Sequence, residues 1–194
     1  LNQAVYLIGG QIPSGAYTDD VYRTTDGINY TLIQSAASFG AYSRCKVVVL
    51  NSTIYFLGGT DASAGTNSVY SSTDGITWSL VTATPGWGGS GTSRRDNFAC
   101  FVFKGKMWIL GGIINGTYQS DVWSSSDGSS WTNESATGLT AGDNYAVNVI
   151  NGATLIVTGG RSGAGQLYKI HTSTDGIAYT GGTTVTGLET FTAN

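Results

Sequence analysis

The chain is short of charge. Of its 194 residues only 11% are charged, about half the usual share, and lysine and arginine together number 9. No run of basic residues exists and the net charge is −3, so a nucleic acid is not an expected partner. No apolar stretch approaches the roughly 18 residues of a membrane span, so membrane insertion is not expected either. Solubility must come from serine, threonine, asparagine and glycine, a composition that favours an extracellular or surface-exposed protein, on a cell or a virion.

Cysteine and histidine are scarce as well. Cys45 and Cys100 are the only cysteines, and each lies in an apolar run. We interpret them as thiols packed as small hydrophobic side chains, with a disulfide as the second interpretation and metal ligation as the third. His171 is the only histidine and has no cysteine or carboxylate at a metal-ligand spacing, so neither a metal nor a cofactor is predicted.

Glycine, by contrast, is abundant at 29 residues, and much of it lies in an internal repeat. An apolar run ends in a glycine pair at residues 9–10, 58–59, 111–112 and 159–160, with spacings of 49, 53 and 48. An Asp-Gly pair follows at 26–27, 74–75, 127–128 and 175–176, with spacings of 48, 53 and 48. Because the two anchors keep the same spacing, a whole unit of about 48 residues is repeated.

Each unit contains four short apolar runs that read as strands. In the second repeat they cover residues 45–50, 54–59, 69–72 and 76–81. Asp-Gly between two apolar runs is a strong hairpin signal and predicts a type I′ turn. No run shows sustained helical periodicity, and β-branched and aromatic residues dominate. Four antiparallel strands per unit predict an all-β fold, a β-propeller or a segment of one.

The repeated motifs resemble two known families. A glycine pair ending an apolar strand, followed by spaced aromatic residues, is similar to the kelch repeat; the aromatic pairs are Tyr70 with Trp78 and Trp123 with Trp131. The segment between the aromatics departs from kelch repeats and resembles the Asp-box of sialidases and related propellers, at Ser72, Asp74, Gly75 and Trp78 and again at Ser125, Asp127, Gly128 and Trp131. The resemblance implies that these turns lie at the blade periphery, away from any catalytic centre.

We expect one propeller domain over residues 1–194, with repeats at about 1–44, 45–95, 96–143 and 144–194. The first repeat begins at the turn between its first two strands and lacks its own first strand. The last residues, GLETFTAN, either complete that first blade or lead into a further blade of a longer propeller, and we favour the longer propeller because kelch relatives generally have more than four blades.

In an antiparallel meander, alternate connections share one end of the sheet. The turns between strands one and two, and three and four, are short and repetitive, whereas the loops between strands two and three, and after strand four, vary. Recognition is expected on these variable loops. The candidate ligand-binding residues there are Trp87, Arg94, Arg95, Asp96, Tyr42, Arg44, Asp143, Tyr118 and Arg161.

Three of these candidates have a competing structural interpretation. Trp87 lies on a glycine-rich loop, where its ring can stack on a sugar or instead cover the edge of a blade. Arg94 and Arg95 can bind a carboxylate of a ligand, but a pairing with Asp96 or Asp143 is the favoured interpretation.

One aspartate recurs in each of the four repeats. These four aspartates are predicted to form turns instead of catalysing a reaction, since a catalytic pair would not be copied in each blade. These structural turn residues are Asp26, Gly27, Asp74, Gly75, Asp127, Gly128, Asp175 and Gly176. His171 replaces the aromatic residue found at Tyr22, Tyr70 and Trp123, so it is expected to pack as they do. No catalytic residue is predicted.

These observations favour a non-enzymatic binding or adhesion module that recognises a glycan or a protein through the variable loops. Two other hypotheses stay open. One is a carbohydrate-active enzyme domain, either a glycosidase or a propeller attached to an oxidase, with the remaining aspartates supplying a pair of carboxylates. The other is a structural component of an extracellular or virion assembly, in which the loops pack against further copies of the chain.

Overall fold

The computed structural model describes residues 4–61, 65–88 and 93–184. All regular structure in these residues is β-strand, and the connected sheets are antiparallel, which confirms the all-β prediction. The described part of the chain contains no helix of the length and hydrophobicity that a membrane crossing requires. The contacts divide the chain into two compact units, residues 1–94 with 127–130 and residues 95–126 with 131–194, and each is described by itself.

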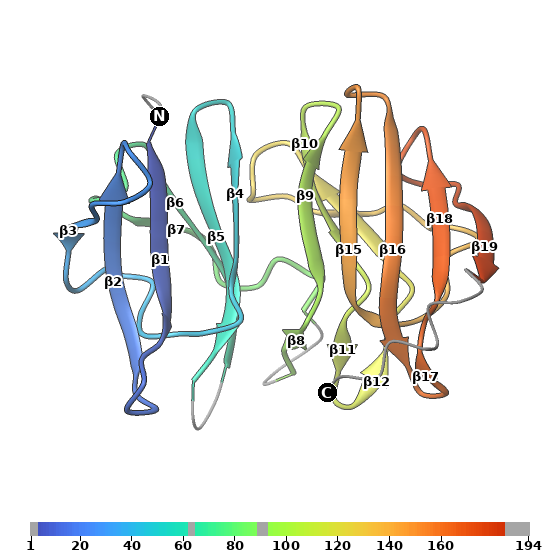
Figure 1. The fold of residues 1–194 in the computed structure, drawn as a ribbon, viewed down its shortest axis with the longest axis horizontal. Helices are drawn as coiled ribbons and strands as arrows, with labels where there is room; N and C mark the ends of the chain where they lie inside the picture. Colours follow the sequence, from blue (N-terminus) through green and yellow to red (C-terminus); the bar gives the residue numbers. More distant parts are fainter. Residues whose placement is uncertain (1–3, 62–64, 89–92, 185–194) are drawn as a thin grey trace. The chain divides into compact units, whose positions relative to one another are not determined.

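The first unit contains two sheets, one from each of the first two repeats (Figure 1). The first sheet has three strands in the order β1 (Val5–Gln11), β2 (Tyr17–Thr24) and β3 (Thr31–Gln34). The second has four, in the order β4 (Lys46–Leu50), β5 (Thr53–Thr60), β6 (Gly65–Ser72) and β7 (Ser79–Thr82). The three-stranded sheet agrees with a first repeat that lacks its first strand.

The second unit repeats the same pattern with additional short strands at one end. The third repeat forms the sheet β9 (Ala99–Phe103), β10 (Lys106–Leu110), β13 (Val122–Ser125) and β14 (Thr132–Asn133). A small sheet joins β8 (Arg95–Asp96), β11 (Ile113–Ile114) and β12 (Thr117–Tyr118). The last repeat forms β15 (Asp143–Ile150), β16 (Thr154–Ser162), β18 (Lys169–Ser173) and β19 (Thr180–Thr184), with β17 (Gly165–Gln166) paired to β16. The terminal GLETFTAN segment lies outside the described residues.

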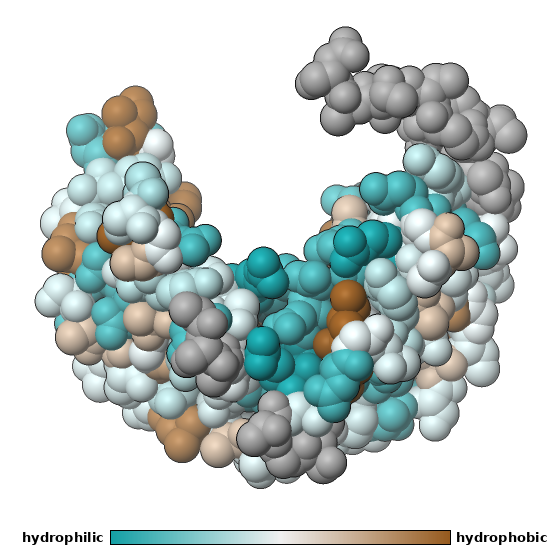
Figure 2. Space-filling model, turned by 90° about the horizontal axis from the view of Figure 1, so that it is seen from below, coloured by the Kyte–Doolittle hydropathy of each residue, from teal (hydrophilic) through white to brown (hydrophobic). Residues whose placement is uncertain are grey.

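Each blade has two different ends, as the strand order predicts (Figure 1). Within its own blade, each of the turns β4–β5, β9–β10 and β15–β16 lies at the end called the turn end below, as does the Asp-Gly corner of that blade. The loops β1–β2, β11–β12 and β16–β17 lie at the other, called the loop end. Seen from below in Figure 2, the loop ends are coloured mainly hydrophilic or neutral, with isolated hydrophobic side chains.

The prediction of a type I′ turn at Asp-Gly is wrong. Only the glycine of each corner has positive φ, and the corner between β6 and β7 spans residues 73–78, so Trp78 precedes the last strand instead of lying on it. Two consecutive positive-φ residues occur instead in the turn between the first two strands, at Asn51 and Ser52 with φ of 49° and 61°. The Asp-Gly pair does not form a two-residue turn here, because hydrogen bonds to the aspartate side chain stabilise a corner of six residues, 73–78.

The core of each unit lies between its two sheets. In the first unit Ile54 and Phe56 of β5 are buried, and the Phe56 ring stacks on Phe39 with centroids 4.2 Å apart. The Trp78 ring meets Phe39 edge-on at 5.0 Å. In the second unit the residues at equivalent positions of β16, Leu155 and Val157, are buried against the third-repeat sheet. These positions alternate along the strand, as expected where one sheet face packs on the next.

Candidate functional site

A polar cluster occupies the loop end of the second unit. Asp143 begins β15, Arg161 lies near the end of β16, and the two residues are direct partners in the strand register. Their side chains differ in exposure: that of Asp143 is 0% exposed and that of Arg161 is 50% exposed. Arg161 Nη2 donates to Asp143 Oδ2 over 3.3 Å, a single contact and not the two-pronged pairing that arginine can form with a carboxylate.

Two asparagines surround the same carboxylate. Asn97 and Asn144 each donate a side-chain N–H to Asp143 Oδ2, at 3.1 and 3.2 Å. Both have φ of 55°, in the left-handed region that asparagine tolerates better than most residues. Asp143 Oδ1, in contrast, is buried and has no hydrogen-bond partner among the described residues. The cluster therefore holds one acceptor oxygen that the protein does not use.

The charge of Arg161 is held in place by its neighbours. The hydrogen bond that Arg161 donates to Asp143, followed by the negative charge of Asp143, raises the pKa of the Arg161 guanidinium, and Tyr118 contributes in the same direction. Tyr118 comes from β12, so the cluster combines side chains from three strands. Three residues that the sequence nominated, Asp143, Tyr118 and Arg161, are thus brought together.

Arg95 is internal and not available to a ligand. Its side chain is 1% exposed and forms two hydrogen bonds of 2.7 Å with the two carboxylate oxygens of Asp121, while Nη1 also donates to the carbonyl of Gly111. The pairing that we favoured for Arg95, with Asp96 or Asp143, is therefore wrong. Asp121, directly before β13, accepts a hydrogen bond from each of the two terminal nitrogens of Arg95. Trp123 Nε1 donates to the same Asp121 at 2.6 Å. Burial raises the pKa of Asp121, but the hydrogen bond and charge of Arg95 outweigh it and the net shift is downward.

Trp87 is also internal. Its side chain is 0% exposed, so a ligand at this loop would not meet the indole ring, and the placement agrees with the packing interpretation. Arg94 is half-buried and lies across the backbone at Gly65, where a Cβ would be 2.0 Å from Arg94 Cδ. Trp87 and Arg94 both belong to the first unit, and neither has an exposed side chain.

The remaining nominated residues lie at the start of the first strands. Tyr42 is half-buried and packs on Gly59, and its carbonyl accepts a hydrogen bond from the Gly10 N–H at 2.9 Å. Arg44 is exposed with φ of 56° and Asp96 is half-buried in β8. Aligning the first strands places Arg44 at the same repeat position as Asn97 and Asn144. The sequence analysis did not nominate Asn97, Asn144 or Asp121. The two asparagines could have been found from this alignment, because they share the repeat position of Arg44.

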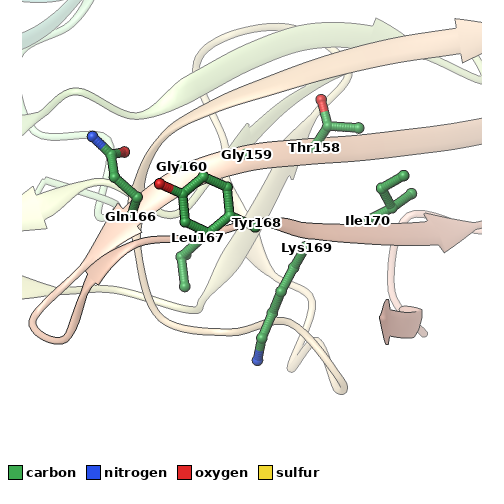
Figure 3. A pocket seen from close by; sticks show the side chains of 8 residues that line it. All are labelled: Thr158, Gly159, Gly160, Gln166, Leu167, Tyr168, Lys169 and Ile170. Atoms are coloured by element: carbon green, nitrogen blue, oxygen red, sulfur yellow. The ribbon is translucent and has the colours of Figure 1, made fainter. Parts of the chain in front are cut away.

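A second feature of the loop end is an apolar hollow of about 280 Å³ in the last blade, which Figure 3 shows from close by. Tyr168 presents its ring to the hollow, beside the backbone of Gly160, and Lys169 points away from that ring. Lys169 Nζ donates to Thr140 Oγ1 at 3.3 Å, so its charge is directed elsewhere. The hollow offers shape and an aromatic ring but no free charge.

The aspartates of the corners form local hydrogen bonds. Asp74 Oδ1 accepts the backbone N–H groups of Ile76 and Thr77, both at 2.8 Å, and the Ser72 hydroxyl at 2.9 Å. These backbone hydrogen bonds lower the pKa of Asp74. Asp26 and Asp175 accept equivalent bonds from the residues that follow them, which is the geometry of a turn-forming aspartate.

His171 is buried in β18 at 2% exposure, on the sheet face that also carries Val157. It packs at the position of the aromatics in the other repeats, as the repeat predicted. Both of its ring nitrogens lack a hydrogen-bond partner among the described residues, and burial lowers its pKa. Cys45 and Cys100 are each half-buried and are not bonded to each other; burial raises the pKa of Cys45 to about 11. Within the described ranges no group of three or more His, Cys, Asp or Glu side chains could hold a metal ion.

Comparison with known proteins agrees with this architecture. The model of a family described as DUF6242 beta propeller domain matches residues 2–126, more than half of the chain. A search of the curated proteins returns no match.

Proposed function

The chain belongs to the DUF6242 beta propeller domain family, and from that premise we propose that it is a binding module that recognises a glycan or a protein surface with its loop end. We also propose that its repeats are kelch-like with Asp-box-like corners. The module acts in an extracellular or surface-exposed setting, which its low charge and its wealth of serine and threonine support.

One observation carries the proposal: the cluster of Asp143 and Arg161 has unused hydrogen-bonding capacity. Asp143 Oδ1 lacks a partner among the described residues, and Arg161 is half exposed and engages its carboxylate through one nitrogen. The half-exposed guanidinium of Arg161 can donate hydrogen bonds to the hydroxyl oxygens of a ligand, while the buried Asp143 carboxylate holds it in place. Pairs of neighbouring hydroxyls are the recurring feature of sugars, so a glycan is the first ligand class to test.

The nearby surface supports a binding role over a reaction. Tyr118 joins the cluster from β12, and Tyr168 lines the hollow in the last blade, which also carries Asp143 and Arg161. Aromatic rings of this kind offer apolar area with a polar edge at little entropic cost.

A glycan array with the purified chain tests the proposal, followed by titration of any ligand found. Arg161→Ala is expected to weaken binding by about tenfold or more, since it removes a charged hydrogen-bond donor. Lys104→Ala is the matched control: it removes a cation from the turn end of the same unit, where Nζ donates to the Thr174 carbonyl and lies 5.4 Å from the centroid of the Phe103 ring. Binding that is unchanged in Arg161→Ala and in Asp143→Asn, with both variants folded, would exclude the cluster as the site.

A further inference from the structure

A polar groove of about 600 Å³ opens at the turn end of the first unit, between the sheet β1–β3 and the sheet β4–β7. The cluster described above belongs to the second unit. One wall is the first sheet, with Tyr6, Arg23 and Ile33. The other wall belongs to the second repeat and consists of Ser52 in the β4–β5 turn and the corner residues Thr73, Asp74 and Ile76.

The first wall departs from the repeat. Tyr6 and Arg23 face each other as register partners on β1 and β2, so their side chains share one face of the sheet. In the third repeat the same pair is Trp108 and Ser124. There the two residues are 3% and 2% exposed, so this position is closed, whereas Tyr6 and Arg23 are only half-buried. Arg23 therefore occupies a position that a small hydroxyl residue, Ser124, fills in the third repeat.

Arg23 has no partner of its own. Among the described residues its guanidinium takes part in neither a hydrogen bond nor an ion pair, although an arginine offers five N–H donors. It is the one cation among the residues that line the groove. A half-buried arginine in a cavity can donate two parallel hydrogen bonds to an anionic group of a ligand.

The second wall departs from the repeat at Ser52. It has φ of 61°, in the left-handed region, where the equivalent residues of the third and fourth repeats are Gly105 and Gly152. A serine in that conformation costs stability that glycine would not, and such strain gathers at functional positions. Here the substitution places a hydroxyl group at the groove.

The Asp-Gly corner completes the site. Asp74 uses Oδ1 to hold the corner through the bonds from Ile76, Thr77 and Ser72. The Thr77 side chain adds a further hydrogen bond to this carboxylate, which lies at the exposed surface of the groove. Tyr6 and Ile76 add apolar area, so the groove combines one cation, one carboxylate, two hydroxyl side chains and a ring.

We propose that this groove binds an acidic saccharide, whose carboxylate pairs with Arg23 while its ring hydroxyls contact Ser52, Thr73 and Asp74. A single carboxylate suits a groove with one cation, because a doubly charged phosphate would add repulsion from Asp74. The volume matches the range of small-ligand sites and holds a saccharide of one or two units. The site lies beyond the function proposed for the loop end and does not depend on it.

Titration calorimetry of the full chain with a glucuronate-containing disaccharide, and with its neutral glucose counterpart, tests the proposal. Binding of the acidic sugar is expected to exceed that of the neutral one by about tenfold or more and to weaken as salt is added. Arg23→Ser, which installs the small hydroxyl residue of the other repeats, is expected to abolish this preference. Arg44→Ser removes an exposed arginine from the loop end of the same unit and is expected to change nothing.

Three results would overturn the proposal. The first is the absence of measurable binding, and the second is equal binding of the acidic and neutral sugars. The third is loss of binding in Arg44→Ser or Arg161→Ala but not in Arg23→Ser, which would move the ligand to the loop end and support the function proposed there. An acidic peptide that binds Arg23 more tightly than the sugar would likewise refute the saccharide class. Thermal melting of each variant ensures that a folded chain is compared throughout.

Discussion

The corner glycines provide a test of how neighbouring blades hold together. Gly27 and Gly75 both have positive φ, 74° and 79°, and both belong to the first unit. They differ in surroundings: a Cβ on Gly27 would have nothing within 4 Å, whereas a Cβ on Gly75 would lie 2.5 Å from Cε1 of Tyr6 on the preceding sheet. The same contact recurs in the second unit, where a Cβ on Gly176 would lie 2.7 Å from the Trp108 ring.

The expected costs follow from these distances. Gly27→Ala should cost about 1 to 2 kcal/mol of unfolding free energy, since alanine in the left-handed region is strained by about that amount. Gly75→Ala carries the same strain, and in addition the Tyr6 ring must move away from the new methyl group. Overpacking of this kind costs typically 1 to 3 kcal/mol, so Gly75→Ala should be the more harmful change by about that difference.

Urea denaturation of the full chain, followed by tryptophan fluorescence, measures both variants. The double variant Gly75→Ala with Tyr6→Ala removes the ring, and the extra cost of Gly75→Ala should then disappear; this coupling is the direct measure of contact between the blades. Equal destabilisation by Gly27→Ala and Gly75→Ala, or no coupling with Tyr6, would refute the reasoning.

Three further predictions concern buried polar groups. Burial lowers the pKa of His171 below its ordinary 6.5, so the folded chain resists protonation of this ring. The contribution of His171 to stability should be complete above about pH 6.5 and fall as the pH drops below that value. A pH series of melting temperatures measures this fall, which should be smaller in His171→Phe. Arg95→Ala should cost about 3 kcal/mol or more in a denaturation experiment, because it leaves Asp121 without its two-pronged partner, and a loss below 1 kcal/mol would contradict a structural role. Cys45, whose pKa is raised to about 11, should react slowly with iodoacetamide at pH 7.5 in the native chain and rapidly once unfolded; equal rates would show that the thiol is not shielded.

The repeat made the fold predictable and left the contacts of single residues open. The repeat spacing located the main strands of each sheet, because each repeat presents the same apolar run to the next sheet, but it did not predict the short strands β8, β11, β12 and β17. It could not identify Asp121 as the partner of Arg95, since ion pairs depend on which side chains the register brings within reach. Nor could it place Trp87, because a tryptophan among glycines is equally compatible with an exposed and a buried loop.

The positions where one repeat departs from the others carry the functional information in this chain. At Gly27, Gly75 and Gly176 all copies agree, because the corner needs positive φ. Arg23 and Ser52 are different: the other copies show that a small hydroxyl residue and a glycine satisfy the fold at these two positions. Folding therefore does not explain either residue, yet both line the same groove although 28 residues separate them in the chain. Two independent departures that converge on one cavity are better explained by a ligand than by packing, and that convergence is visible only after the sheets have been assembled.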